Sequence, residues 1–166
     1  NSDYMTANVI QGGGTAAEPT VTIGSDVVVD SGDASQIASM TYDTTNNKVF
    51  VAYDNNGDGK VRGAIGTVTA GTNAISFAGV ADIWDYSSGG DYFDVAFDDV
   101  TDKIMFFYRD DDNSDALTYK IITPGASSFS VASGAVLSSN DNRVVSGTAS
   151  FGTNKGVLVG TWDTGN

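Results

Sequence analysis

The stretch VAYDNNGDGKV carries oxygen-bearing side chains at the spacing of a calcium loop. Asp54, Asn56 and Asp58 alternate along it and a glycine follows, so that successive oxygens could turn toward one ion. The later ligand positions hold arginine and isoleucine, where such a loop needs another acid. The same letters contain Asn-Gly and Asp-Gly, the dipeptides of tight hairpin turns. A solvated turn is therefore the leading interpretation, and weak calcium binding at Asp54, Asn56 and Asp58 is the alternative.

The segment DIWDYSSGGDYFD gathers aromatic rings beside carboxylates. Aromatic faces can stack on the C–H faces of a sugar while carboxylates accept its hydroxyl groups. Trp84, Asp85, Tyr86 and Tyr92 are thus a candidate carbohydrate site. Packing between neighbouring sheets is the leading interpretation of the same rings.

The sequence contains few of the residue types that usually carry out catalysis. The chain has no histidine and no cysteine, which removes the usual general base, the thiolate nucleophile and the commonest zinc ligands. Acid pairs such as Asp98-Asp99 and Asp110-Asp111 could in principle supply the two carboxylates of a glycosidase. The loop Asp110–Asp112 is a second place for weak calcium binding. Neighbouring acids in turns are usually solvated, so we assign no catalytic residue and expect no enzyme and no cofactor beyond weakly bound calcium.

The composition predicts an all-β protein with many turns. Twenty of the twenty-one acids are Asp, leucine is scarce, and Val, Thr, Ile, Tyr, Phe, Gly, Ser and Asn are abundant. The net charge of −13 and eight scattered basic residues argue against nucleic acid and anionic membrane as partners. No stretch approaches a membrane span, and the acidic surface suits an extracellular protein.

An internal repeat organises the chain. QIASMTYDTTNNKVFVAYDNNGDG registers without a gap over DYFDVAFDDVTDKIMFFYRDDDNS, which places Tyr42 over Phe97 and Tyr53 over Tyr108. A third copy, VSGTASFGTNKGVLVGTWDTGN, puts Phe151 at the Tyr42 position, and NSDYMTANVIQ overlays NSDALTYKIIT. The period is about 54 to 55 residues. Because these aromatic residues recur at one phase, we predict that they are core residues.

Each period reads as four short strands, at about 36–42, 48–54, 61–69 and 74–84 in the copy at 36–90. Four antiparallel strands at this period are typical of a β-propeller blade. The chain then forms a single repeat domain of two full blades and two half blades. We name these parts unit 1 (1–35, strands three and four), unit 2 (36–90), unit 3 (91–144) and unit 4 (145–166, strands one and two).

The two ends of the chain resemble the two sides of one loop. Joined head to tail they read TWDTGNSDYMTA, which is similar to FYRDDDNSDALTY. Three blades are too few to close a propeller. We therefore expect either a homo-oligomer whose half blades complete one another, or a piece of a longer chain with neighbouring repeats.

The pattern MTYDTTNNKVFVAYDNNGDG … IGTVTAGTNAISFAG resembles tandem repeats of tail-fibre and virion-appendage proteins of marine, cyanophage-type phages, and of marine bacterial surface proteins. The shared elements are Tyr-Asp, Asn-Lys-Val and Val-Ala-Tyr in the first half of a unit and Gly-Thr-Val and Ile-Ser-Phe in the second. The last copy departs from the pattern, with Gly152 where an Asp is usual.

This resemblance implies a non-enzymatic structural or adhesive module on a virion or cell surface, used in attachment. A carbohydrate-binding lectin is the first alternative and a secreted glycan-active enzyme the second.

Overall fold

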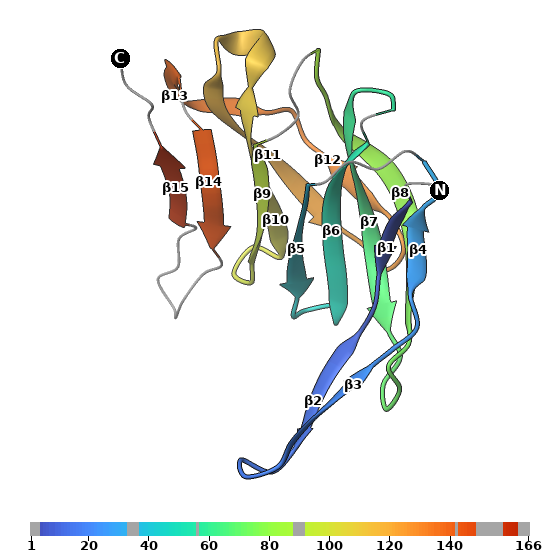
Figure 1. Cartoon of the computed structure of the whole chain (residues 1–166). Coiled ribbons are helices and arrows are strands. Elements are labelled where there is room, and N and C mark those ends of the chain that lie inside the picture. Colours follow the sequence, from blue (N-terminus) through green and yellow to red (C-terminus); the bar gives the residue numbers. More distant parts are fainter. Residues whose placement is uncertain are drawn as a thin grey trace.

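The computed structural model describes residues 4–32, 37–55, 57–87, 92–141, 143–148 and 158–162 and shows an all-β protein made of several antiparallel sheets (Figure 1). Its elements in chain order are β1 (Met5–Ala7), β2 (Ile10–Gly14), β3 (Pro19–Ile23), β4 (Val27–Asp30), β5 (Ala38–Asp43), β6 (Lys48–Asn55), β7 (Lys60–Val68), β8 (Ile75–Asp85), β9 (Phe93–Asp98), β10 (Lys103–Asp110), the 3₁₀ turn η1 (Asp111–Asn113), β11 (Ala116–Pro124), β12 (Phe129–Val131), β13 (Ala135–Asp141), β14 (Arg143–Thr148) and β15 (Leu158–Trp162). Among these described residues, no helix is both long and apolar enough to span a bilayer.

Unit 2 forms a four-stranded antiparallel meander, β5-β6-β7-β8. Its strands fall within two residues of the predicted ranges, because turn-forming residues separate apolar alternating runs. The predicted alternation of β6 is confirmed: Phe50 and Ala52 lie in one apolar cluster, whereas Val51 and Tyr53 lie in another on the opposite face.

Unit 3 repeats this meander as β9-β10-β11-β12, and β13 pairs with the other half of β11. Two short strands therefore stand where unit 2 has the single strand β8. Register shifts in β8 and β13 mark the same part of each unit as irregular.

The end units form smaller sheets. In unit 1, β1 pairs with β4, and β2 with β3 make a long hairpin that projects from the body, which we call the arm (residues 10–23; Figure 1). In unit 4, β14 pairs with β15. The sheets β1-β4 and β14-β15 lie on opposite sides of the molecule (Figure 1).

Consecutive units meet through equivalent strands. β5 of unit 2 lies beside β9 of unit 3, and β9 in turn lies beside β14 of unit 4. The Val95 N–H donates to Ser39 Oγ at 3.2 Å and the Phe97 N–H donates to Thr41 Oγ1 at 3.1 Å. In each of these two bonds the donor and the acceptor residues are 56 positions apart in the sequence, close to the repeat period. The first strands of units 2 and 3 are thus joined by hydroxyl groups of unit 2 that accept hydrogen bonds from backbone donors of unit 3.

The main core fills the space between units 2 and 3. It contains Phe50, Ala52, Val61, Ile65, Ile83 and Trp84 from unit 2 and Phe93, Val95, Phe97, Ile104, Phe106, Tyr108 and Ile122 from unit 3. Phe129 joins it edge-on to Phe50, with ring centroids 5.2 Å apart. A smaller cluster joins Val51 and Tyr53 of unit 2 to Val29 of unit 1.

The prediction that Tyr42 is a core residue is wrong. Its side chain is 49% exposed, whereas Phe97 at the same phase of unit 3 is 3% exposed and Tyr53 and Tyr108 are buried as predicted. The reason is the neighbour: Phe97 packs against the complete sheet of unit 2, but Tyr42 faces the side of unit 1, which contributes no first or second strand among the described residues. Phe151, the third member of the set, lies outside the described residues.

Candidate functional site

The proposed calcium loop is a turn between two paired strands. β6 ends at Asn55 and β7 begins at Lys60, and these two residues are cross-strand partners. Gly59 has a φ of +68°, a conformation that costs glycine little. The prediction of a turn at this position is therefore confirmed.

The acids of this loop have protein partners. Asp54 is buried and its carboxylate accepts a hydrogen bond from the Tyr86 hydroxyl. The Asp58 carboxylate forms an ion pair with the Arg62 guanidinium. Asn56 lies outside the described residues. Within the described part of the chain, no group of three His, Cys, Asp or Glu side chains is placed to hold a metal ion.

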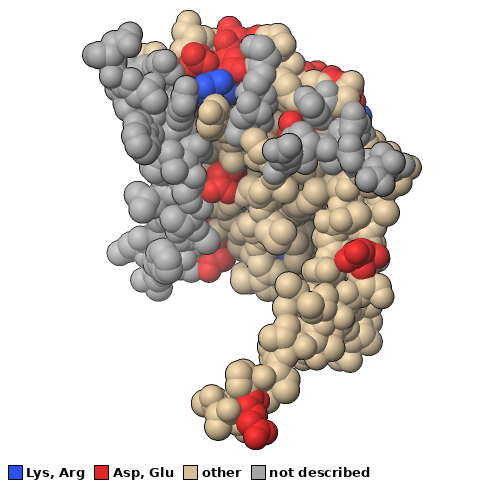
Figure 2. Space-filling view, viewed as in Figure 1, with Lys and Arg blue, Asp and Glu red and all other residues tan. Residues whose placement is uncertain are grey.

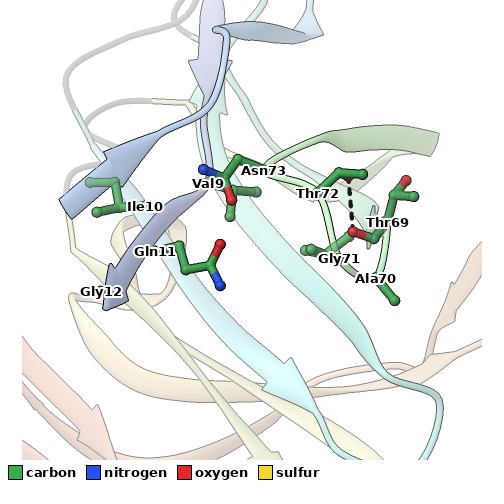
Figure 3. Close-up of a pocket in the computed structure, with 10 residues that line it drawn as sticks. Val9, Ile10, Gln11, Gly12, Thr69, Ala70, Gly71, Thr72 and Asn73 are labelled. Atoms are coloured by element: carbon green, nitrogen blue, oxygen red, sulfur yellow. Dashed lines mark hydrogen bonds between the residues drawn. The ribbon is translucent and has the colours of Figure 1, made fainter. Parts of the chain in front are cut away.

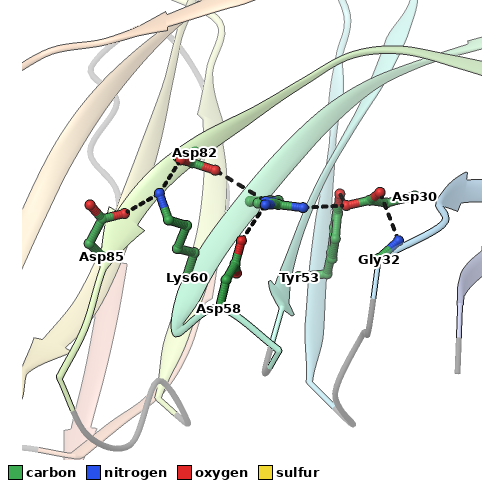
Figure 4. A network of polar contacts seen from close by, with 8 residues as sticks. Asp30, Gly32, Tyr53, Asp58, Lys60, Asp82 and Asp85 are labelled. Atoms are coloured by element: carbon green, nitrogen blue, oxygen red, sulfur yellow. Dashed lines mark hydrogen bonds and ion pairs between the residues drawn. The ribbon is translucent and has the colours of Figure 1, made fainter.

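Arg62 of β7 is the centre of a polar network, and Figure 4 shows the acids that surround it. Its guanidinium contacts Asp30 Oδ2 of unit 1 at 3.1 Å and Asp82 Oδ1 of β8 at 3.1 Å, in addition to Asp58. Lys60, two residues earlier on the same face, contacts Asp82 at 2.5 Å and Asp85 at 3.3 Å. The network thus ties unit 1 to unit 2 and β7 to β8.

The electrostatics of this network favour the ionised forms of Asp30 and Asp82. Burial alone would raise the pKa of Asp30, but hydrogen bonds from the Gly32 N–H, the Tyr53 hydroxyl and Arg62 hold it below its usual value. A hydrogen bond from Lys60, and a second from Arg62, lower the pKa of Asp82. Burial together with the bond to Asp30 raises the pKa of the Tyr53 hydroxyl, which stays a donor.

The aromatic part of the candidate sugar site is largely internal. Trp84 is 5% exposed and its ring lies 4.4 Å from Tyr108 and 5.4 Å from Tyr86, measured between centroids. Tyr92 is half-buried, and the Arg109 guanidinium lies 4.6 Å from its ring centroid. These contacts agree with the packing interpretation of the rings.

A shallow hollow of about 350 Å³ nevertheless opens beside Trp84, lined by Asp82, Ile83, Trp84, Asp85 and Lys120. Asp85 is well exposed, with 73% of its side chain accessible. Lys120 Nζ donates to the Ile83 carbonyl at 2.8 Å, and burial lowers the pKa of this amine. The structure thus brings Trp84 and Asp85 of the predicted set together with Asp82 and Lys120; neither Tyr86 nor Tyr92 lines the hollow.

The acid pairs considered for catalysis bond to nearby groups. Asp98 accepts hydrogen bonds from the Thr101 hydroxyl and the Val100 N–H, which lower its pKa. The Asp111 carboxylate contacts Arg109 Nε at 2.8 Å. Burial, opposed by Arg109, raises the pKa of Asp111, and burial beside the charge of Asp112 raises that of Asp110. These are bonds that shape turns and strand ends.

A second hollow, of about 390 Å³, lies between the root of the arm and the β7–β8 turn (Figure 3). Val9–Gly12 line one side and Val68–Asn73 the other. The turn is closed by the Thr72 hydroxyl, which donates to the Thr69 carbonyl at 3.0 Å. Gly24 closes the root of the arm, because an added Cβ there would collide with the Asn73 carbonyl. The root of the arm therefore lies directly against the β7–β8 turn of unit 2.

Comparisons with models of protein families, with curated proteins and with solved structures find no match to this chain. The assignment of function rests on the sequence and on the geometry.

The sequence reasoning missed the basic residues of the site. The sequence pattern identifies Arg62 solely as an unsuitable calcium ligand and includes Lys60 and Lys120 among the scattered basic residues. The strand register carries no simple signal for these pairs: counting back from the β7–β8 turn would set Arg62 opposite Ala81 and Lys60 opposite Ile83. Two register shifts in the β7–β8 pair bring Asp82 and Asp85 opposite them instead.

Proposed function

We propose that this chain is a structural or adhesive module of an extracellular or virion-surface assembly, built from propeller-like blades and without enzymatic activity. The observation that carries the proposal is the junction of units 2 and 3. There, equivalent first strands lie side by side, hydroxyls of one unit bond backbone donors of the next, and the largest core lies between the two sheets. In such an arrangement each unit packs against its neighbours and stabilises them, as in other repeat proteins.

In the propeller-like interpretation, units 2 and 3 are one full blade each, and units 1 and 4 are half blades. This interpretation is supported by the four-strand order of unit 2, by its recurrence in unit 3, and by the contact of β5 with β9 and of β9 with β14. The partners of this module are other copies of the chain or neighbouring repeats of a longer chain. The acidic surface gives no support to nucleic acid or membrane insertion as a target.

The test of the adhesive role is retention on cells. Beads that carry the chain should be held by marine bacterial cells more strongly than beads that carry an unrelated protein of equal negative charge. Equal retention of the two kinds of bead would contradict adhesion. Release of reducing sugar from a marine polysaccharide would contradict the non-enzymatic proposal and favour a glycan-active enzyme.

A second candidate function, carbohydrate binding, is favoured by the hollow beside Trp84. Carboxylates of Asp82 and Asp85 and the amine of Lys120 would serve as acceptors and donor for sugar hydroxyls. If so, Asp85→Ala should abolish binding on a glycan array, whereas Glu18→Ala, which removes the same charge at the tip of the arm, should leave it unchanged. Equal binding by both variants would contradict a sugar site in this hollow.

A further inference from the structure

Apolar side chains of the arm lie on one face and are open to solvent. Ile10, Val21 and Ile23 are 65%, 66% and 62% exposed. The strand register places them together, because Ile10 is the partner of Ile23 and Val21 is the partner of Gly12, two residues along. Gln11 and Thr22 occupy the opposite face.

The same positions of unit 3 are covered. The repeat aligns Ile10 with Ile122, and the cross-strand pairs then align Ile23 with Val131 and Val21 with Phe129. Ile122 is completely buried, and Val131 and Phe129 pack against the core formed with unit 2. The surface that covers them includes Phe50 and Gly63, since a Cβ on Gly63 would lie 3.0 Å from the Phe129 ring.

β5 shows the same contrast. Met40 and Tyr42 are exposed, whereas Val95 and Phe97, at the same phase of β9, are buried against unit 2. Both exposed surfaces therefore belong to the side of a unit that faces its predecessor.

A complementary surface exists at the other end of the molecule. Met105 and Tyr119 of unit 3 correspond to Phe50 and Gly63 of unit 2 by strand register, and both side chains are partly exposed. Val136 and Leu137 of β13 are exposed nearby on the same unit. Among the described strands, β15 pairs with β14 and with no other, and β1 pairs with β4 and with no other. One pair supplies strands one and two of a unit, and the other supplies strands three and four.

Charge permits these surfaces to meet. The arm has one charged residue, Glu18, in a chain with a net charge of −13. The space-filling view shows the arm free of charged side chains except at its tip (Figure 2). Two strongly acidic molecules repel each other, so an uncharged apolar arm is the part that a second copy can approach at least cost.

We infer that this side of unit 1 and β5 binds a second copy of the chain, whose β14-β15 pair joins β1-β4 to complete a four-stranded unit. Ile10, Val21 and Ile23 then cover Met105 and Tyr119 of the second copy, as Phe129 covers Phe50 within one chain. Met40 and Tyr42 lie against β14 of that copy, as Val95 and Phe97 lie against unit 2. The inference rests on the propeller-like packing proposed above.

The test is the mass of the particle in solution. Sedimentation velocity of the unmodified chain over rising concentration should show a defined species heavier than one chain. Ile23→Asp and Tyr42→Asp should each weaken this association about tenfold or more, because they bury a charge in the contact. Thr22→Asp adds the same charge on the opposite face of the arm and should leave the association unchanged. Circular dichroism of all variants should match that of the unmodified chain.

Disulfide trapping gives an independent measurement, since the chain has no cysteine of its own. Chains with Val21→Cys mixed with chains with Met105→Cys should form a mixed disulfide dimer on mild oxidation, because these positions correspond to Phe129 and Phe50, and Thr22→Cys chains should not. A single-chain mass at every concentration would overturn the inference. Equal effects of Ile23→Asp and Thr22→Asp, or equal trapping by Val21→Cys and Thr22→Cys, would overturn it as well. Cell binding by a strictly monomeric chain would overturn this inference alone, whereas an oligomer that binds no cells would overturn the adhesive role alone.

Discussion

Arg62 joins acids that come from separate parts of the chain. Asp30 belongs to unit 1, Asp58 to the β6–β7 turn and Asp82 to β8, and the Arg62 side chain is 23% exposed. A planar guanidinium can serve several carboxylates at once because it presents five donors in fixed directions. Arg62 therefore holds unit 1 against unit 2 by charge, where the apolar cluster around Val29 is small.

Replacing Arg62 by Met should destabilise the protein by about 2 kcal/mol, the usual range for hydrogen bonds to charged groups. The loss follows because Asp30, with 14% of its side chain exposed, would remain without its guanidinium partner. Lys60→Met removes a cation of the same strand whose contacts are solvent-exposed, and it should cost much less. Urea unfolding of both variants measures the difference, and equal losses would contradict the role assigned to Arg62.

Acid should remove part of the stability that Arg62 provides. The folded-state pKa values of Asp30 and Asp82 are lowered, so their contribution is complete above the unfolded-state pKa of about 4 and is lost as the pH falls through the folded-state values. The raised pKa values of Asp110 and Asp111 act in the opposite direction. The informative quantity is therefore the difference in unfolding free energy between the unmodified chain and Arg62→Met. This difference should shrink between pH 7 and pH 3, and a constant difference would contradict the account.

At the scale of single residues, the sequence predicted local conformation better than it predicted which side chains contact one another. The turn at Asn56-Gly57 and Asp58-Gly59 follows from local backbone preferences and was predictable. The burial of Trp84 against Tyr108 depends on how two sheets stack, which no local pattern reports. The same holds for Lys120, whose amine reaches the carbonyl of Ile83 thirty-seven residues away.

Gly63 marks how closely the sheets of units 2 and 3 approach. An added Cβ would lie 3.0 Å from the Phe129 ring of unit 3, and 2.7 Å from the Phe50 ring and 2.9 Å from Ile83 Cδ1 of unit 2, so the packed side chains of the two sheets leave no room there. Gly63→Ala should therefore destabilise the protein by about 1–3 kcal/mol, the usual cost of overpacking a core. Gly12, on the arm, has open space around its Cβ position. Gly12→Ala should be neutral or slightly stabilising in the same thermal unfolding measurement, and a neutral Gly63→Ala would contradict the tight junction.

Whole strands were the best-predicted elements. Alternating apolar residues between turn-rich segments gave the four strands of unit 2 to within two residues. The division of the fourth strand of unit 3 into β12 and β13 was not predicted. It depends on how each half pairs with β11, and pairing partners are a property of the sheet.

In the whole molecule the sheets stand in a row, and one side of each unit forms the contact with the next unit. This explains why Tyr42 is exposed although its repeat partner Phe97 is buried: burial belongs to the junction between units, and the sequence of a single unit does not reveal whether its neighbour is present. It also explains why the internal repeat predicted buried residues better than the composition did. Residues at the same position of two units are both buried where each unit has a neighbouring unit on that side.

A cross-link between Ser39 and Asp94 tests the junction most directly. The Ser39 hydroxyl donates to the Asp94 carboxylate, so the two side chains meet across β5 and β9. With Ser39→Cys and Asp94→Cys in one chain, a short bifunctional thiol reagent should bridge the two cysteines within the folded protein. The pair Thr22→Cys and Asp94→Cys, which joins the arm to β9, should not be bridged within one chain. Bridging of the 39–94 pair alone would support the side-by-side first strands; bridging of neither pair, or of both pairs equally, would contradict the stacked arrangement on which the proposed function rests.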